Sequence, residues 1–369
     1  MHTNNLLKFL TIGLLVLSGS SHALAAPYRF EQLTGPVGGW EATAINGSGQ
    51  IAGAAGDPIG YAIQAGTWTD GNLTLLERTA TSSRALAIND QGQVAGEIWT
   101  PITGRTAAVW SNNTQTILAR TSETTSQYAT GINNSSLVVG NRSQDYERTF
   151  QAVTWRNYDV KPLDMLGATS SYATGVNNTG QISGYLQYVS GSSTVTQAVV
   201  WNGDQVTQLL ATGGNACCAQ ALAISNTGVV VGDVFGNGTS MPVYWQGTEA
   251  ATPLAAPTNG GQALGINSLG QAVGTGFVGP WGVALLWDLT TGQYTDLNTY
   301  LTTDQVAAGW VLNRAVAIND VGDIVGIAYN TKQASFRPFA LMAIPEPSTL
   351  VYMSLGLLAL GLQHRRSRL

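Results

Sequence analysis

A short pattern of apolar and polar positions recurs along most of the chain. Its first copy runs from Ala44 to Gly53: two apolar residues, an Asn-x-x-Gly segment, then apolar residues that end on a second glycine. Seven copies are present, and their asparagine positions hold Asn46, Asn89, Asn133, Asn177, Ser225, Asn267 and Asn319. Six intervals span the 273 residues from Asn46 to Asn319, a mean period of 45.5. A fixed period of this length predicts a propeller or a solenoid.

Each Asn-x-x-Gly segment predicts a tight turn between two strands. The Asn side chain at the first position can bond the backbone ahead, and Gly at the fourth position accepts the left-handed conformation that closes the hairpin. The turn glycines are Gly49, Gly92, Gly180, Gly228, Gly270 and Gly322. Two copies differ. Ser225 replaces Asn, which the turn tolerates, and Ser136 replaces Gly, which should strain the third turn.

The glycine that ends each copy falls inside or at the end of the strand after the turn. These residues are Gly53, Gly96, Gly140, Gly184, Gly232, Gly274 and Gly326. Glycine within a strand indicates a bend or the close approach of another backbone.

A second apolar phrase follows each copy. In six copies it ends on tryptophan, namely Trp68, Trp110, Trp155, Trp201, Trp245 and Trp287, and Phe339–Met342 takes its place in the seventh. A polar turn and a segment ending in Leu complete the period, which therefore holds about four short strands, as one propeller blade does. We interpret the tryptophans as packing between blades. A ligand-stacking surface is the alternative, since aromatic faces hold sugars and cations.

These patterns predict an all-β, seven-bladed β-propeller over residues 27–343. The seventh copy stops after its third strand, and residues 28–33 resemble the missing fourth strand. We therefore expect residues 28–33 to pair with the strand around Arg337–Met342 and to close the ring, which removes open sheet edges. The period lengthens at 213–218 and at 300–310. A functional site is expected first at these insertions.

The two ends of the chain carry targeting segments. Lys8, the apolar run 9–17 and the small-x-small site at 23–25 predict an export signal peptide over residues 1–26. The last segment, 344–369, contains an apolar stretch from Leu350 to Leu362. We expect it to form a single transmembrane helix, with arginines on the cytoplasmic side and the core outside the inner membrane. The flanking residues are Pro345, Glu346 and Pro347 before it, and Arg365, Arg366 and Arg368 after it.

The charge of the core argues against a nucleic-acid partner. The whole chain has 16 basic and 21 acidic residues; leaving out Lys8, the three tail arginines and Glu346 gives 12 and 20, a net charge of −8. No Lys or Arg lies between Lys161 and Arg314. Nucleic-acid binding needs a basic footprint, which this core lacks.

The reactive residues restrict the chemistry that the core can perform. The three histidines are His2, His22 and His364, so the core has none, which excludes Ser-His-Asp and Cys-His catalysis and His-ligated zinc. Paired carboxylates stay open. Candidate acids are Glu97, Asp145, Glu147 and Asp233, although surface acids mostly serve solvation. Turn acids such as Asp90, Asp320 and Asp323 could bind Ca²⁺, but turn geometry explains Asp90 and Asp320 without metal.

The adjacent Cys217 and Cys218 are the only cysteines. In an exported protein they meet an oxidising compartment, where they form a strained disulfide or remain thiols. We assign no catalytic, cofactor or metal-binding residue.

The C-terminal segment resembles the PEP-CTERM sorting signal of Gram-negative bacteria. It has all three parts: the Pro345-Glu346-Pro347 tripeptide, the apolar stretch and the basic end. The resemblance implies processing by an exosortase and a surface or extracellular destination, often linked to exopolysaccharide. The repeats, over about residues 40–342, resemble the HAF family of extracellular repeats, whose core is Ile-Asn-x-x-Gly-x-Val-x-Gly. The family's His-Ala-Phe phrase is absent, replaced by phrases such as Gln151-Ala152-Val153.

Three functions fit these observations. We expect a non-catalytic, monomeric surface protein that binds a matrix component, with exopolysaccharide as one candidate partner. The alternatives are a carbohydrate-active enzyme that uses carboxylates and a purely structural matrix component. Convergence of two carboxylates in one pocket with aromatic walls would distinguish the enzyme from the other two.

Overall fold

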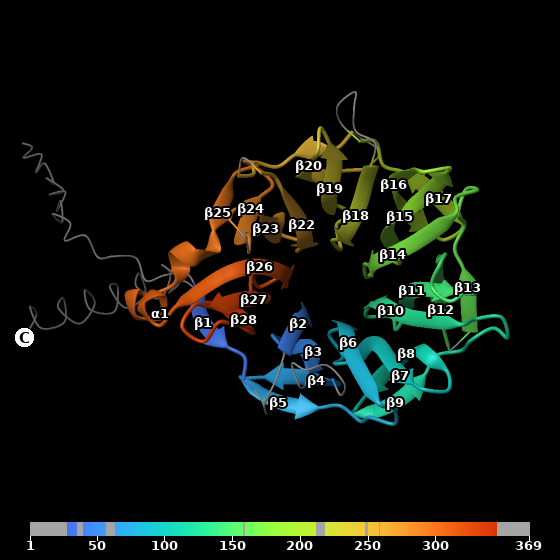
Figure 1. Ribbon diagram of the computed structural model, residues 1–369, viewed down its shortest axis with the longest axis horizontal. Coiled ribbons are helices and arrows are strands. Elements are labelled where there is room, and N and C mark those ends of the chain that lie inside the picture. Colours follow the sequence, from blue (N-terminus) through green and yellow to red (C-terminus); the bar gives the residue numbers. More distant parts are fainter. Residues whose placement is uncertain are drawn as a thin grey trace, which may run out of the picture.

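The computed structural model of the protein describes residues 28–34, 40–56, 63–157, 159–211, 218–247, 250–257, 259–279 and 281–344. Within them the chain is all-β apart from two short helices, η1 (Leu297–Tyr300) and α1 (Thr303–Ala307). The sequence repeats are successive antiparallel sheets set around a common axis, a propeller-like arrangement (Figure 1). The predicted signal peptide and the sorting segment from Pro345 onward lie outside the described residues.

Each repeat holds four strands in order from the axis outward, and in repeat 7 the outer strand is the N-terminal β1 (Tyr28–Gln32) (Figure 1). Repeat 1 holds β2 (Trp40–Ile45), β3 (Ile51–Ala55), β4 (Gln64–Thr69) and β5 (Asn72–Leu75). Repeat 2 holds β6 (Ser82–Ile88), β7 (Val94–Thr100), β8 (Gly104–Ser111) and β9 (Thr114–Ile117). Repeat 3 holds β10 (Ser126–Ile132), β11 (Val138–Ser143), β12 (Gln151–Arg156) and β13 (Asp159–Pro162). Repeat 4 holds β14 (Ser170–Val176), β15 (Gln181–Ser190), β16 (Ser193–Asn202) and β17 (Gln205–Gln208).

The remaining repeats follow the same order. Repeat 5 holds β18 (Cys218–Ile224), β19 (Val230–Gly236), β20 (Thr239–Trp245) and β21 (Thr252–Pro253), and one parallel residue pair, Thr196 with Cys218, joins its sheet to that of repeat 4. Repeat 6 holds β22 (Gly261–Ile266), β23 (Gln271–Gly276), β24 (Val283–Asp288) and β25 (Tyr294–Asp296). Repeat 7 holds β26 (Trp310–Ile318), β27 (Ile324–Asn330), β28 (Ser335–Ala343) and, as its outer strand, β1 (Tyr28–Gln32).

The N-terminal strand β1 pairs where the sequence predicts. It runs antiparallel to β28, with Tyr28 opposite Ala343 and Gln32 opposite Phe339. Leu33 continues the pairing through its N–H, which donates to the Pro338 carbonyl at 3.2 Å. Leu33 also joins Trp68 of repeat 1 and Val325 of repeat 7 in one buried cluster. The two ends of the described chain therefore lie side by side, and repeats 1 and 7 share a core.

A bulge and a glycine shape the inner strand pair of every repeat. The pairing of the first two strands shifts by one residue in all seven, for example between Ala42 and Ala44. The seven strand glycines lie opposite these bulges. A Cβ on any of them would lie 1.9–2.1 Å from a carbonyl oxygen of the first strand. Only glycine fits there, which is the close backbone approach that the sequence predicts.

The six tryptophans pack between repeats. Trp68, Trp110, Trp155, Trp201, Trp245 and Trp287 are all buried. Each indole N–H donates to a carbonyl just after the outer strand of the preceding repeat, at 2.6–3.0 Å. The alternative of a ligand-stacking surface is therefore wrong. In repeat 7 Leu341 occupies the tryptophan's register position, and the Phe339 ring packs over Gly326.

The turn asparagines link neighbouring repeats as well as shaping their turns. The Asn46 side-chain amide donates to the carbonyl of Asn89 in the next repeat at 3.0 Å. The same bond recurs from Asn89, Asn133, Asn177, Asn267 and Asn319, and the last of these returns to the Asn46 carbonyl at 3.0 Å. Ser225 has no amide, and its hydroxyl pairs with Thr227 instead. The described residues thus hold six of seven possible links around the axis.

The turns have the predicted local geometry. The N–H of the fourth residue donates to the carbonyl of the first at 3.0–3.1 Å in six turns. All six turn glycines have positive φ, and Ser136 takes the same left-handed conformation at φ 58°. That conformation is uncommon for a residue with a side chain, so the strain expected in the third turn is present.

The longer insertion supports the fold. Leu297 of η1 is fully buried, and the Tyr300 ring lies 4.9 Å from that of Tyr28. Tyr300, Leu301 and Trp310 of the insertion also pack in the core cluster of repeat 7, so the insertion packs against repeat 7, and the expectation of a site there stays a prediction. Cys218 begins β18, whereas Cys217 and the rest of the 213–217 insertion lie outside the described residues, so the disulfide and thiol alternatives stay predictions.

Gly184→Ala should destabilise the protein by about 3 kcal/mol or more, because overpacking here forces a backbone shift. Its Cβ would lie 2.0 Å from the Tyr172 carbonyl and 2.7 Å from the Trp201 ring. Gly175→Ala in the same repeat is the matched control, since its nearest contact is the Ser183 hydroxyl at 3.2 Å. Denaturant unfolding gives both free energies, and equal stabilities would contradict the packing described.

Candidate functional site

The strands of each repeat end on two opposite faces. The turn face carries the Asn-x-x-Gly turns, and the hairpin face carries the loops between the second and third strands. On the hairpin face a cavity of about 570 Å³ lies between repeats 2 and 3. Its lining includes Arg84, Glu97, Trp99, Arg105, Ser126, Tyr146 and Glu147. We call it the Glu97 cavity.

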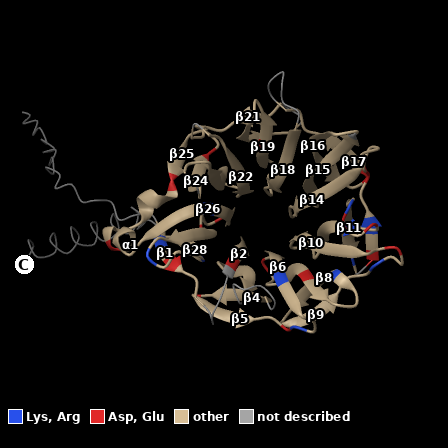
Figure 2. Ribbon diagram, viewed as in Figure 1, with Lys and Arg blue, Asp and Glu red and all other residues tan. Residues whose placement is uncertain are grey.

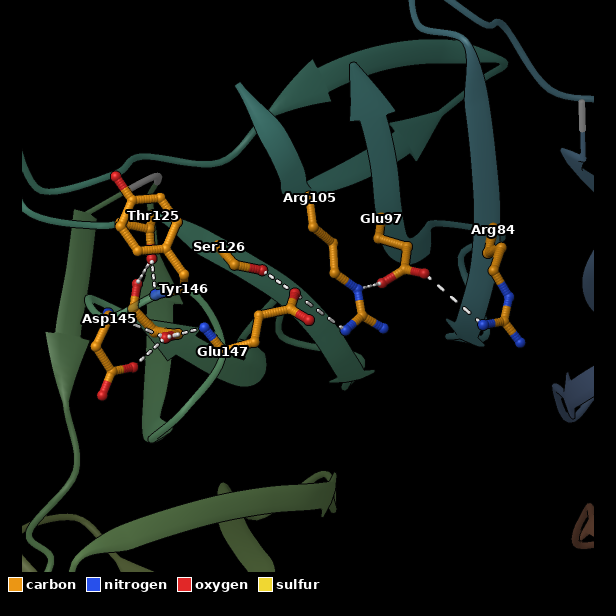
Figure 3. A network of polar contacts seen from close by, with 9 residues as sticks. Arg84, Glu97, Arg105, Thr125, Ser126, Asp145, Tyr146 and Glu147 are labelled. Carbon is orange, nitrogen blue, oxygen red and sulfur yellow. Dashed lines mark hydrogen bonds and ion pairs between the residues drawn. The ribbon is translucent and has the colours of Figure 1, made fainter. Parts of the chain in front are cut away.

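A chain of ion pairs crosses the Glu97 cavity (Figure 3). Arg105 bonds the Glu97 carboxylate through Nε, and its other end lies 3.7 Å from Glu147 Oε1. Arg84 lies 3.8 Å from the second Glu97 oxygen. The remaining donors of Arg84 make two bonds, of 2.6 and 2.8 Å, to Glu41 of repeat 1. Charges from three adjacent repeats therefore meet on one side of the axis.

Strand register explains why these side chains meet. Arg84 and Glu97 are directly opposite each other on β6 and β7, where cross-strand pairs interact. Arg105 enters from β8, and its guanidinium lies 4.1 Å from the centre of the Tyr128 ring of repeat 3, a cation–π contact. Burial disfavours the Arg105 charge, but the Glu97 carboxylate, together with Tyr128 and Glu147, outweighs it and raises the pKa of Arg105 above its ordinary value.

The loop between β11 and β12 is held in an unusual conformation beside the cavity. Tyr146 and Glu147 have φ of 58° and 67°, so two successive side-chain-bearing residues are left-handed. Such strain costs on the order of 1–3 kcal/mol per residue and tends to occur at functional sites. The Thr125 hydroxyl and the Ser143 hydroxyl accept the two N–H groups, at 3.0 and 2.9 Å.

Asp145 stabilises the same loop through hydrogen bonds to Thr149. Its two carboxylate oxygens accept from the N–H and the hydroxyl of Thr149, at 2.9 and 2.7 Å. These bonds lower the pKa of Asp145 to about 2. The loop presents Tyr146, 85 % exposed, and Glu147, which accepts from the Ser126 hydroxyl. Trp99, 46 % exposed, also lines the cavity. Aromatic and charged groups thus line one opening.

The acids singled out from the sequence fall in two places. Glu97 and Glu147 meet at Arg105, and Asp145 holds the loop beside them. Asp233 lies elsewhere, on β19, where it accepts from Ser240 and Gln262, and burial raises its pKa. Sequence reasoning missed Arg84, Arg105, Trp99 and Tyr146. The sequence feature that could have pointed to these residues is the concentration of basic residues in repeats 2 and 3, which Figure 2 shows.

The turn acids make structural bonds. Asp90 and Asp320 accept the N–H groups of Gly47 and Ser268 in neighbouring repeats, each at 2.7 Å. Asp323 accepts from Asn319 and from the Ala343 N–H. No group of three or more His, Cys, Asp or Glu that could hold a metal ion occurs within the described ranges.

The described part of the chain also has no helix long and apolar enough to cross a membrane, and residues 350–362 lie outside it.

Comparisons with known proteins bear on the tail. Residues 343–366 match the model of the PEP-CTERM protein-sorting motif, which confirms that part of the prediction. A search of curated proteins finds no match to the chain.

Solved structures with a similar arrangement include TolB from Acinetobacter baumannii, at 12 % identity and TM-score 0.47, covering 67 % of this chain and 63 % of that one. A gluconolactonase from Xanthomonas campestris has 12 % identity and TM-score 0.42 over 72 % and 92 % of the two chains. The six-bladed propeller lectin of Aleuria aurantia has 13 % identity and TM-score 0.39 over 83 % and 97 %. The chain thus spans less than two thirds of the TolB structure.

The loop that presents Tyr146 should loosen in acid. The pKa of Asp145 is about 2 in the folded protein against an ordinary 3.8, so its support is complete above the ordinary value and is lost as pH falls through about 2. Pepsin should therefore cut near Tyr146 at the low end of this window and not at pH above it. Asp145→Asn should be cut throughout, and Asp204→Asn, remote from the loop, should behave as the parent. Equal cutting of the parent across the window, with unchanged circular dichroism, would contradict this.

Proposed function

We propose that the chain is an exported, exosortase-processed surface protein that binds carbohydrate without transforming it. In this proposal the seven repeats are HAF-type blades of one closed propeller, and the Glu97 cavity is the binding site. One observation carries it: Trp99 and Tyr146 stand exposed in an opening whose polar lining includes the Glu97–Arg105–Glu147 ion-pair chain.

The chemistry of the cavity suits a sugar. A sugar ring has an apolar face that stacks on an aromatic ring, and hydroxyls that need both donors and acceptors. Glu147 supplies carboxylate oxygens from a side chain that is partly open to solvent. The guanidinium of Arg105 is fixed on both sides by acids, so it offers donors in a set direction. Preorganised groups of this kind reduce the entropy lost on binding.

A carbohydrate-active enzyme is the second candidate, because two carboxylates do converge in an aromatic-walled cavity. Such an enzyme needs one acid that gives a proton and one carboxylate that acts as base or nucleophile. Here the same guanidinium lies between Glu97 and Glu147, so both carboxylates act as ion-pair acceptors. That arrangement favours recognition over proton transfer.

Binding should depend on the aromatic and acidic walls of the cavity. On a glycan array, Trp99→Ala and Glu97→Gln should each weaken the binding of the parent's best glycan by about tenfold or more, as losses at binding hot spots do. Trp281→Ala is the matched control, because Trp281 is an exposed tryptophan of repeat 6 outside the cavity.

Release of new reducing ends from the bound glycan, abolished by Glu97→Gln, would instead establish the enzyme. Absence of any glycan binding by the parent would leave the structural matrix role. Loss in Trp281→Ala without loss in Trp99→Ala would place the site elsewhere.

The proposed cellular destination of the protein is inferred from its C-terminal tail. The match over residues 343–366 implies recognition by an exosortase, which holds the substrate at the membrane before cleavage. Release to the cell surface or matrix, by way of a transmembrane segment at 350–362, is our proposal for the steps that follow.

Replacing Pro345, Glu346 and Pro347 with alanine should leave the protein in the membrane fraction with its tail intact, because the exosortase motif is removed. Ser367→Ala, in the same tail but outside the tripeptide, should be processed normally. The intact mass of each mature protein is the measurement. A processed triple variant would show that the tripeptide is not the recognised element.

A further inference from the structure

Both ends of the described chain leave the propeller from the turn face. Ala343 is the last residue of β28, and its N–H donates to Asp323 in the seventh turn at 2.8 Å. Tyr28, the first described residue, lies opposite Ala343 in the pairing of β1 with β28. Six residues, 344–349, separate this point from the apolar segment 350–362. Fully extended, six residues reach only about 20 Å. A membrane that holds the segment therefore lies close to the turn face.

Among the described residues, two Asn-x-x-Gly turns carry an apolar side chain at their third position. The third residue of each turn is polar in the first five repeats, where it is Ser48, Gln91, Ser135, Thr179 or Thr227. In repeats 6 and 7 it is Leu269 and Val321, which are 68 % and 61 % exposed. The two apolar tips thus belong to repeat 7, which ends at the exit, and to its neighbour repeat 6.

Two more exposed side chains extend the same area. Tyr294 at the start of β25 is 39 % exposed and lines a surface cavity together with Leu269. Ile344, directly after β28, is 46 % exposed. Leucine, valine and tyrosine on a surface are suited to the boundary between lipid headgroups and acyl chains. We name Leu269, Tyr294, Val321 and Ile344 the exit patch.

We propose that the exit patch rests on the lipid surface while the tail is still uncleaved, so that the Glu97 cavity on the opposite face points away from the membrane. The inference depends on the membrane anchoring proposed above. Acidic residues border the patch, since Asp288 and Asp320 lie on the turn face of repeats 6 and 7, and Arg29 on β1 is the exposed base beside it. The contact is therefore apolar and should not require anionic lipid.

The test places a reporter at equivalent turn positions. The full chain with its tail, carrying Cys217→Ser and Cys218→Ser, receives one new cysteine: Leu269→Cys, Val321→Cys or, as matched control, Ser135→Cys at the same turn position of repeat 3. Each is labelled with an environment-sensitive fluorophore and mixed with protein-free vesicles of phosphatidylcholine, with and without phosphatidylglycerol. Flotation reports anchoring, and quenching by lipids with nitroxide-labelled headgroups reports contact.

We expect the labels at 269 and 321 to be quenched at least about twofold more than the label at 135, with or without phosphatidylglycerol, since interfacial groups sit within 10 Å of the headgroups. Equal quenching at the three positions in chains that float would overturn the proposal, and would leave a protein such as the exosortase as occupant of the patch. Failure to float would remove membrane anchoring itself, and the proposal with it.

Discussion

The close approach of two backbones beneath a glycine sets the geometry of every repeat. The first strand bulges toward the second, and its carbonyl comes within 2.1 Å of where a Cβ would be. In four repeats the tryptophan ring also lies 2.7–3.0 Å from that position. With the innermost pair packed in this way, the turn at its end lies beside the next turn. The asparagine amide then reaches the neighbouring carbonyl. Packing within a repeat and bonding between repeats therefore both depend on the strand glycine.

The candidate site follows from the same constraint. The residues whose carbonyls face these glycines include Glu41, Arg84 and Tyr128 in the first three repeats. Across the repeat boundaries, the Arg84 side chain bonds Glu41 of repeat 1, and Arg105 contacts the Tyr128 ring of repeat 3. At the same positions repeats 5 and 6 carry Gln220 and Gln262, and no ion-pair chain is described there. One framework therefore yields different surfaces around the axis, and function depends on the residues that occupy a few equivalent positions.

Much of the architecture could be predicted because the residues that determine it recur in each repeat. The turns, the strand glycines, the tryptophan strands and the position of β1 all recur with the period or complete it. The bonds between asparagines could not be predicted, because they join residues more than forty positions apart whose role in a turn already explained them. The Glu97 cavity was missed for a related reason. The cavity is formed by residues of repeats 2 and 3 that differ from those at equivalent positions of the other repeats, and by the strained loop at 145–149. No periodic pattern reveals either.

The account depends most on the N-terminal strand being an integral part of repeat 7. Denaturant unfolding, followed by the fluorescence of the buried tryptophans, should compare residues 27–369, with the tail retained, with the same chain lacking residues 28–34. The comparison also needs a control that lacks residues 363–369, which removes the same number from the other end. We predict that the first deletion lowers the free energy of unfolding by about 4 kcal/mol or more, because the pairing with β28 and the burial of Tyr28 and Leu33 are lost, while the second has little effect. Unfolding of both variants at the denaturant concentration of the parent would contradict the role of β1 as the outer strand of repeat 7.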